Sequence, residues 1–242
     1  FRRVLFRSRL DDSGSNTSPN VNTTTLSLAS TVTVTSVNNQ PTLTASTSTP
    51  TFTEGGSAVS LFSSAAASTI ESGQTLTRLD LTVSGVVDGS TEQIIADGTT
   101  INLVNGSGTT STNSMTYTVT VSGTTATLSL TKSGGISAAN MQTLINGMTY
   151  QDSGNDPTAG NRVITLTRLD DSGSNTSPNV NTTTLSLAST VTVTPVNNQP
   201  TLTASTSTPT FTEGGSAVSL FSRSEEHTSE LQSLRHLVCR LL

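Results

Sequence analysis

Three acidic residues in the middle of the chain are the first candidates for chemistry. Asp88, Glu92 and Asp97 lie close together in the sequence, and two carboxylates roughly 5 to 10 Å apart are enough for glycoside hydrolysis. The aromatic residues argue against such a site. The chain has no Trp, and its Phe and Tyr residues mostly lie in alternating runs where core packing is expected. We therefore expect no enzyme activity.

A second acidic segment resembles a calcium loop only in part. The run Asp-Asp-Ser-Gly-Ser-Asn occurs at Asp11–Asn16 and recurs from Asp170. A calcium-binding loop of the helix–loop–helix type needs Gly at its sixth position and a closing Glu, and both are missing here. Asp followed by Ser and Gly favours a turn in which the carboxylate accepts a hydrogen bond from the backbone two residues on. The segment therefore predicts an Asx-type turn.

The two ends of the chain differ in composition from everything between them. Residues 1–8 read FRRVLFRS, and the reverse complement of one back-translation of this string encodes RSEEHTSE, the sequence of Arg223–Glu230. Such an inverted terminal repeat resembles a translated sequencing adapter, so we interpret 1–8 and 223–242 as adapter artefacts. The alternative is a basic arm and an amphipathic C-terminal helix.

The adapter interpretation removes the residues that most often carry catalysis. Both histidines, His227 and His236, and the only cysteine, Cys239, lie in the C-terminal segment. Without them, residues 9–222 hold neither His nor Cys. Ser-His-Asp sites, Cys-His sites and His/Cys zinc sites are then excluded.

Charge limits the partners. Five basic residues stand against thirteen acidic ones within residues 9–222, which gives a net formal charge of −8. Nucleic acid is therefore not an expected partner. No stretch approaches the roughly 18 apolar residues of a membrane span, so membrane insertion is not expected either. The absence of Cys fits an exported protein that does without disulfides, and we expect an extracellular or cell-surface location.

A long internal repeat sets the organisation. Arg9 to Ser63 recurs as Arg168 to Ser222, an offset of 159 residues, with Ser36 against Pro195 as the single difference. A period of this length fits a whole domain rather than one unit of a solenoid. Taking Val-Asn-Asn-Gln-Pro as the boundary, residues 41–199 form one complete repeat. Residues 9–40 are then the end of a preceding repeat, and 200–222 are the start of the next.

Within the complete repeat, apolar residues alternate with Thr or Ser, as in Met115–Val121 and Val163–Thr167. This pattern predicts strands that are buried on one face. Turn residues such as Asp97-Gly98 separate the runs and favour antiparallel hairpins in a two-sheet β-sandwich. One short helix is expected at 137–146, capped by Ser137 and ended by Asn146-Gly147.

The stretch Thr35–Leu61 reads TSVNNQPTLTASTSTPTFTEGGSAVSL. It resembles the junctions of cadherin-like repeats in very large bacterial secreted adhesins. The resemblance implies an all-β fold of tandem Ig-like or cadherin-like antiparallel β-sandwich repeats outside the cell, with calcium stiffening the junctions. The junction residues of this chain that would hold the ion are Asn38, Asn39, Glu54 and Glu71. The alternative is that they are turn residues and solvated acids.

The sequence is compatible with three functions. The first is a non-catalytic extender or stalk repeat of a bacterial surface or secreted adhesin, whose partners are the neighbouring repeats of the same chain. The second is a module that binds a glycan or a protein through loops such as Asp88–Glu92 and Asn105–Asn113. The third is a phage or capsule structural fibre. Calcium is the only cofactor that the resemblance implies.

Overall fold

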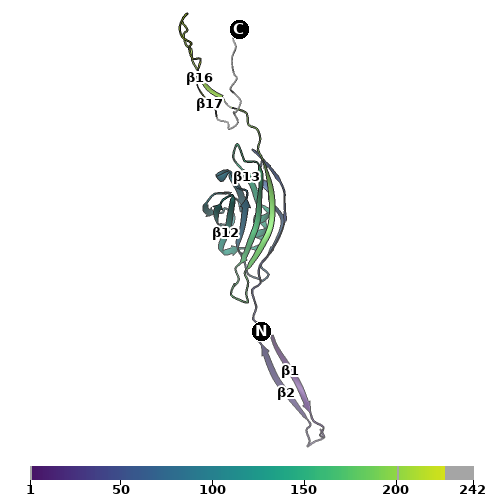
Figure 1. The fold of residues 1–242 in the computed structure, drawn as a ribbon. Coiled ribbons are helices and arrows are strands. Elements are labelled where there is room, and N and C mark those ends of the chain that lie inside the picture. The colour runs from purple at the N-terminus through teal and green to yellow at the C-terminus, as the bar shows by residue number, and fades with distance from the viewer. Residues whose placement is uncertain (1, 201, 227–242) are drawn as a thin grey trace.

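Strands dominate the structure, as the alternation of apolar and hydroxyl side chains predicts (Figure 1). The computed structural model describes residues 2–200 and 202–226. The largest sheet has seven strands. Their order is β10 (Gly106–Thr109), β11 (Thr116–Ser122), β12 (Thr125–Ile136), β7 (Leu76–Ser84), β14 (Gly160–Asp171), β15 (Thr182–Thr194) and β4 (Thr51–Thr53). Neighbours are antiparallel except β15 and β4, which run parallel.

Two smaller sheets complete the central domain. The four-stranded sheet has the order β5 (Val59–Ser60), β13 (Thr149–Asp152), β8 (Glu92–Ala96) and β9 (Thr99–Asn102), and the two-stranded sheet pairs β3 (Thr42–Thr47) with β6 (Phe62–Ser68). A short 3-10 helix, η1 (Gly89–Thr91), leads into β8. The predicted all-β class with one short helix is confirmed.

One hydrophobic core joins these sheets. Leu79, Leu81 and Val83 alternate along β7 and are fully buried, and they belong to the same cluster as Ile94 of β8 and Tyr150 of β13. The period of two puts every second residue of β7 on the core side. The cluster runs from Leu43 to Val193, inside the predicted complete repeat of residues 41–199.

The helix α1 (Ala138–Asn146) forms where the sequence predicts it. Ser137 lies at the N-cap, and its Oγ accepts a hydrogen bond from the Asn140 N–H at 3.1 Å. Met141, Leu144 and Ile145 are buried, which is the i, i+3, i+4 face that a short amphipathic helix presents to a core. At the other end the Gly147 N–H donates to the Thr143 carbonyl at 3.0 Å.

The predicted Asp97-Gly98 turn joins β8 to β9. Ala96 pairs with Thr99 across it, so only two residues make the connection. Asp97 has φ of 51° and Gly98 has φ of 75°. Positive φ at both central residues defines the turn type that matches the twist of a hairpin, and Asp-Gly is a preferred pair for it.

Two further hairpins lie beyond opposite ends of the central domain (Figure 1). One pairs β1 (Arg2–Asp11) with β2 (Thr23–Val32), and the other pairs β16 (Leu202–Thr206) with β17 (Phe221–Glu226). Both strands that resemble adapter, residues 2–8 in β1 and 223–226 in β17, are therefore paired. Residues 227–242, which include His227, His236 and Cys239, lie outside the described residues.

Candidate functional site

The four residues of the predicted junction site do not meet in one place. Asn38, Asn39 and Glu71 come together where the chain enters the central domain, while Glu54 follows β4 and bonds to residues that leave it. These two places are separated by the length of β15, which has 13 residues. At about 3.3 Å per residue that strand spans about 40 Å. The structure thus provides two half-sites, one at each end of the domain.

At the entry end, Asn38 is inserted into the loop between β14 and β15. Its side-chain amide donates to the carbonyls of Val180 at 2.8 Å and Ser174 at 3.2 Å, and its backbone N–H donates to Asn179 Oδ1 at 2.7 Å. The Val180 N–H returns a bond to the Asn38 carbonyl at 3.0 Å. Asn38 is buried, so the linker is anchored to the domain at this residue.

A glycine makes this insertion possible. A Cβ at Gly173 would lie 2.1 Å from Asn38 Oδ1, far closer than two such atoms can approach. Asp171 shapes the same loop, because its Oδ1 accepts the Gly173 N–H at 2.8 Å. The equivalent Asp12 Oδ1 accepts the Gly14 N–H at 2.7 Å. The Asx-type turn predicted for both copies is confirmed.

Asn39 is fixed by the predicted carboxylate. Glu71 Oε1 accepts the Asn39 backbone N–H at 3.1 Å and its side-chain amide at 2.6 Å. Bonds to a charged acceptor are stronger than those between neutral groups. The carboxylate of Glu71 therefore holds both the backbone and the side chain of the second linker asparagine.

Three oxygens around Asn38 and Asn39 are buried and accept no hydrogen bond within the described chain. They are Glu71 Oε2, Gln74 Oε1 and Asp171 Oδ2. Burial raises the pKa of Asp171; the bonds from Gly173 and Asn38 oppose this, and the nearby charge of Glu71 adds to it. Oxygen atoms of this kind are the ligands that calcium prefers. Calcium at this junction stays a prediction, with Asp171 as an additional carboxylate.

At the exit end, Glu54 holds the next linker. Its Oε2 accepts the Val196 backbone N–H at 2.8 Å, and its Oε1 accepts the side-chain amide of Asn198 at 2.8 Å. The same amide donates to the Asn155 carbonyl at 2.5 Å. Glu54 therefore bonds the linker after the domain in the same way as Glu71 bonds the linker before it. Each glutamate accepts hydrogen bonds from one backbone N–H and one asparagine side chain.

The repeat relates the two half-sites. Asn39 and Asn198 are the same position of successive repeats, because they are one offset of 159 residues apart. In a tandem array each linker would therefore be bonded by Glu54 of the domain before it and by Glu71 of the domain after it. An asparagine side chain carries two N–H donors. At Asn198 they go to Glu54 and to the Asn155 carbonyl, so Glu71 of the next domain would have to take the place of that carbonyl. The two glutamates that the sequence places in one site would meet there across a junction.

Asp97 has a structural role. Its Oδ2 accepts the Thr110 hydroxyl at 2.5 Å and the Asn113 backbone N–H at 3.0 Å, and its Oδ1 accepts the Asn113 side chain. These bonds tie the turn between β8 and β9 to the loop before β11. Asp88 and Glu92 do not join it; both are ion-paired with Arg162.

Sequence reasoning predicted a turn at Asp171 and Gly173, but it did not place either of them, or Gln74, at the junction. A signal was present for Gly173, because a glycine inside the repeated Asp-Ser-Gly-Ser loop is a position where another chain segment can approach closely. Gln74 lies outside the repeated segments, and its bond from Nε2 to Asn38 Oδ1 at 2.6 Å joins residues with no shared sequence pattern.

Comparisons with protein-family models, with curated proteins and with solved structures return no match. Among the described residues no helix has the length and apolar character needed to cross a membrane.

Proposed function

We propose that this chain belongs to an extender: tandem β-domains of a bacterial cell-surface or secreted adhesin that hold another part of the protein at a distance and carry no catalytic activity. The observation that carries the proposal is the bonding of the two linkers: Glu71 bonds the linker that enters the domain, and Glu54 bonds the linker that leaves it. The near-identity of the repeats and the resemblance of the junction to those of large secreted adhesins support the same reading.

Linker bonding matters because a chain of rigid domains reaches only as far as its junctions resist bending. A hydrogen bond contributes about 1 kcal/mol net, and one to a charged group about 1.5 to 3 kcal/mol. Glu54 and Glu71 each accept two such bonds from linker atoms. A bent junction would have to give up several of them, so the straight arrangement is favoured.

A tandem protein tests this proposal directly. Three copies of residues 41–199 followed by residues 200–222 are measured by small-angle X-ray scattering. Glu54→Ala in every copy should shorten the maximum dimension, because both linker bonds at each exit are lost. Glu54→Gln should have a smaller effect, since an amide oxygen can still accept one of the two bonds.

Glu213→Ala is the matched control. Glu213 is the same position as Glu54 in a copy that no linker follows, and it is exposed. Its substitution should leave the maximum dimension unchanged. If Glu54→Ala in every copy also changes nothing, the junctions are not held by this carboxylate and the extender proposal loses its support.

The role of calcium is separated in the same measurement. Scattering is repeated with and without millimolar Ca²⁺ at constant ionic strength, because salt shortens the reach of repulsion between acidic domains to about 8 Å near 0.15 M. If calcium joins Asn38, Asn39, Glu54 and Glu71 at the junctions, its removal should shorten the particle without unfolding the domains. An unchanged dimension would mean that the hydrogen bonds alone hold the linker.

A further inference from the structure

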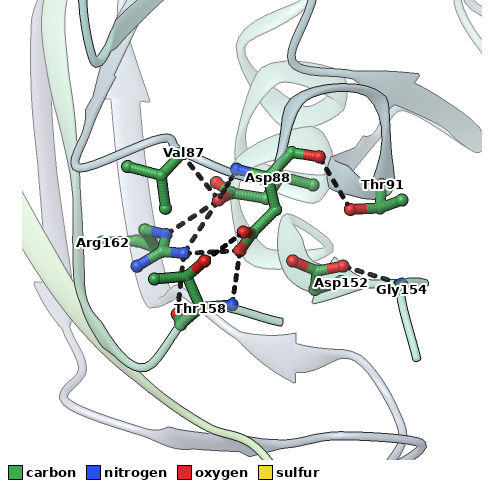
Figure 2. A network of polar contacts seen from close by, with 8 residues as sticks. Val87, Asp88, Thr91, Asp152, Gly154, Thr158 and Arg162 are labelled. Carbon is green, nitrogen blue, oxygen red and sulfur yellow. Dashed lines mark hydrogen bonds and ion pairs between the residues drawn. The ribbon is translucent and has the colours of Figure 1, made fainter. Parts of the chain in front are cut away.

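Three carboxylates from separate elements meet inside the exit end of the domain. Asp88 follows β7, Glu92 begins β8 and Asp152 ends β13, and one oxygen from each lies within 4.8 Å of the others. Glu92 is fully buried and Asp152 is 4% exposed. Figure 2 shows Asp88 and Asp152 side by side, with Arg162 and Thr158 on the far side of Asp88. The cluster is distinct from the linker contacts of Glu54.

The sheet itself forces two of these charges together. Glu92 and Asp152 are direct partners in the antiparallel pairing of β8 with β13. Like charges in directly opposite positions destabilise a sheet, and burial makes an uncompensated charge far more costly. Two acidic residues at these positions therefore need a compensating positive charge or a shared proton.

Arg162 supplies only part of that charge. Its Nη2 lies 2.9 Å from Asp88 Oδ2 and 2.9 Å from Glu92 Oε1, and its side chain is almost fully buried. Burial acts to raise the pKa of Asp88, but the hydrogen bonds from Thr158 and the charge of Arg162 outweigh it, so the pKa is lowered. With all three carboxylates ionised, one guanidinium leaves two negative charges in excess, and Asp152 has no ion pair with Arg162.

The hydrogen bonds are distributed just as unevenly. Glu92 Oε1 accepts the backbone N–H groups of Val87 and Asp88 as well as Arg162 Nε, at 3.0 to 3.1 Å. Glu92 Oε2 accepts none, although it is buried, and neither does Asp152 Oδ2. Asp152 Oδ1 accepts the Gly154 N–H at 2.8 Å. Within the described residues, each of these two carboxylates therefore keeps one buried oxygen free of donors.

The hydroxyl of Tyr150 is a further buried polar group beside this cluster, and it has no hydrogen-bond partner in the described part of the chain. Tyr150 lies two residues before Asp152 on β13, so both side chains are on the same face of the sheet. Burial and the neighbouring charge of Glu92 raise the pKa of this hydroxyl far above its usual range. The cluster therefore combines a buried phenol with two buried carboxylate oxygens, none of which has a hydrogen-bond partner in the described part of the chain.

We propose that Asp88, Glu92 and Asp152 bind a hard divalent cation, and that Ca²⁺ is the ion this cluster fits. A dication balances the two excess charges, and its preference for oxygen ligands in flexible geometry suits carboxylates from a loop and two strands. Mg²⁺ demands near-ideal octahedral geometry, which three ligands already fixed by strand pairing and by Arg162 do not offer. Because Ca²⁺ takes six to eight oxygen ligands, other oxygen atoms, such as those of water, would have to complete the coordination.

A bound ion would affect the segment that contacts the linker after the domain. Asp152 is followed by Ser153, Gly154 and Asn155, and the Asn155 carbonyl accepts the side chain of Asn198. An ion held by Asp152 would order this segment. Binding of the ion does not depend on the extender role, so the two proposals can fail separately.

Terbium luminescence tests the site, because Tb³⁺ replaces Ca²⁺ at oxygen sites and is excited through a nearby tyrosine. The chain has two tyrosines, Tyr117 and Tyr150, and no Trp. After treatment with a chelator, Tb³⁺ is added to the full chain under tyrosine excitation. We expect emission that Ca²⁺ displaces, that Tyr150→Phe abolishes and that Tyr117→Phe leaves in place.

Asp152→Asn is the variant that removes the site. It retains an oxygen for the Gly154 N–H, removes one charge, and should lower Ca²⁺ affinity at least tenfold in calorimetry. Tyr150→Phe should bind Ca²⁺ with unchanged affinity, which separates loss of the reporter from loss of the ion. Asp12→Asn, which changes an exposed carboxylate in the outer hairpin, should alter neither signal.

A thermal-shift measurement guards against a folding defect. Ca²⁺ should raise the melting temperature of the wild-type domain by a few degrees and leave that of Asp152→Asn unchanged, even if that variant starts from a different value. A proton shared between Glu92 and Asp152 is the competing explanation for the free oxygens. Absence of calorimetric Ca²⁺ binding would overturn the proposal and favour the shared proton. Emission that survives Asp152→Asn would overturn it as well.

Discussion

Residues 9–40 and 168–199 have the same sequence apart from Ser36 and Pro195, yet only the second copy enters a core. Both form a hairpin with the same register near the turn, where Arg9 pairs with Thr25 and Arg168 pairs with Thr184. Val32 and Val34 are 58% and 73% exposed, whereas the equivalent Val191 and Val193 are 0% and 2% exposed. The sequence of the repeat is enough for pairing but not for burial.

The other repeated half behaves in the same way. Thr47 pairs with Phe62 inside the domain, and Thr206 pairs with Phe221 outside it. Phe52 is 1% exposed, but the equivalent Phe211 is 58% exposed. Residues 223–226 take the place of residues 64–67 in that pairing without sharing their sequence. Backbone hydrogen bonds make the ladder, so an unrelated strand can complete it.

The difference between the copies lies in the unrepeated strands. Inside the domain β14 pairs with β7 on one side and with β15 on the other, and β7 belongs to residues that occur once in the chain. The outer hairpins have two strands each. An isolated two-stranded hairpin is only marginally stable in water. Stability is therefore expected to differ sharply between identical sequences.

Amide hydrogen exchange should show the largest contrast. We expect exchange across Leu26–Val34 with little protection, and protection across Leu185–Val193 that approaches the global free energy of unfolding, about 5 to 15 kcal/mol for a domain. The measurement is exchange followed by mass spectrometry on peptides that contain Ser36 or Pro195, which tell the copies apart. Equal protection would mean that the first copy also finds a core.

A matched pair of substitutions gives the next largest effect. Phe52→Ala should lower the free energy of unfolding by about 3 to 5 kcal/mol, because Phe52 is buried and its ring meets Tyr150 edge-on at 5.9 Å between centroids. Phe211→Ala should change it by less than about 0.5 kcal/mol. Both changes in the free energy of unfolding are to be measured by urea unfolding. A comparable loss in the two variants would show that the outer copy is packed in solution.

Asn38→Ala and Asn197→Ala form a second pair at the linker. Asn38 is buried and bonded to the loop between β14 and β15, while Asn197 is exposed. Loss of the Asn38 amide should cost about 1 to 3 kcal/mol, since the carbonyls of Val180 and Ser174 lose a donor. Asn197→Ala should be silent in the same unfolding experiment. If it is not, the outer linker has partners of its own.

Secondary structure follows from the sequence to a large extent, because its signals are local. Alternation predicts β7, β11 and β14, and the Ser137 cap with the Met141 and Leu144 spacing predicts α1. The site follows less well. Glu54 and Glu71 are near each other in the sequence, but β5 and β6 carry the chain between them across the domain, so they lie at opposite ends. Only the repeat brings them back together, across a junction.

The buried acidic cluster shows the limit of such reasoning more clearly. The spacing of Asp88 and Glu92 brings them together in the sequence, but Arg162 and Asp152 are distant from both. Strand register decides that Asp152 opposes Glu92, and a shift by one residue would point one of them to the other face. No local pattern fixes the pairing of β8 with β13.

The smallest expected effect concerns the pH dependence at the entry end. Burial raises the pKa of Asp171 above the ordinary value of 3.8, so the folded domain binds this proton more tightly than the unfolded chain. The stabilising contribution of the group is therefore complete below pH 3.8 and is lost as the pH rises through the folded pKa. Asp171→Asn removes the titration while an amide oxygen still accepts the Gly173 N–H. Its free energy of unfolding, relative to wild type, should increase as the pH rises through that window.

Asp12→Asn is the same substitution in the outer copy, whose loop lies outside the domain, and should leave the pH profile of domain unfolding unchanged. A relative stability of Asp171→Asn that falls with rising pH would mean that the carboxylate is stabilised in its charged form, as a bound cation at the entry junction would do; repeating the titration with and without Ca²⁺ then identifies that ion.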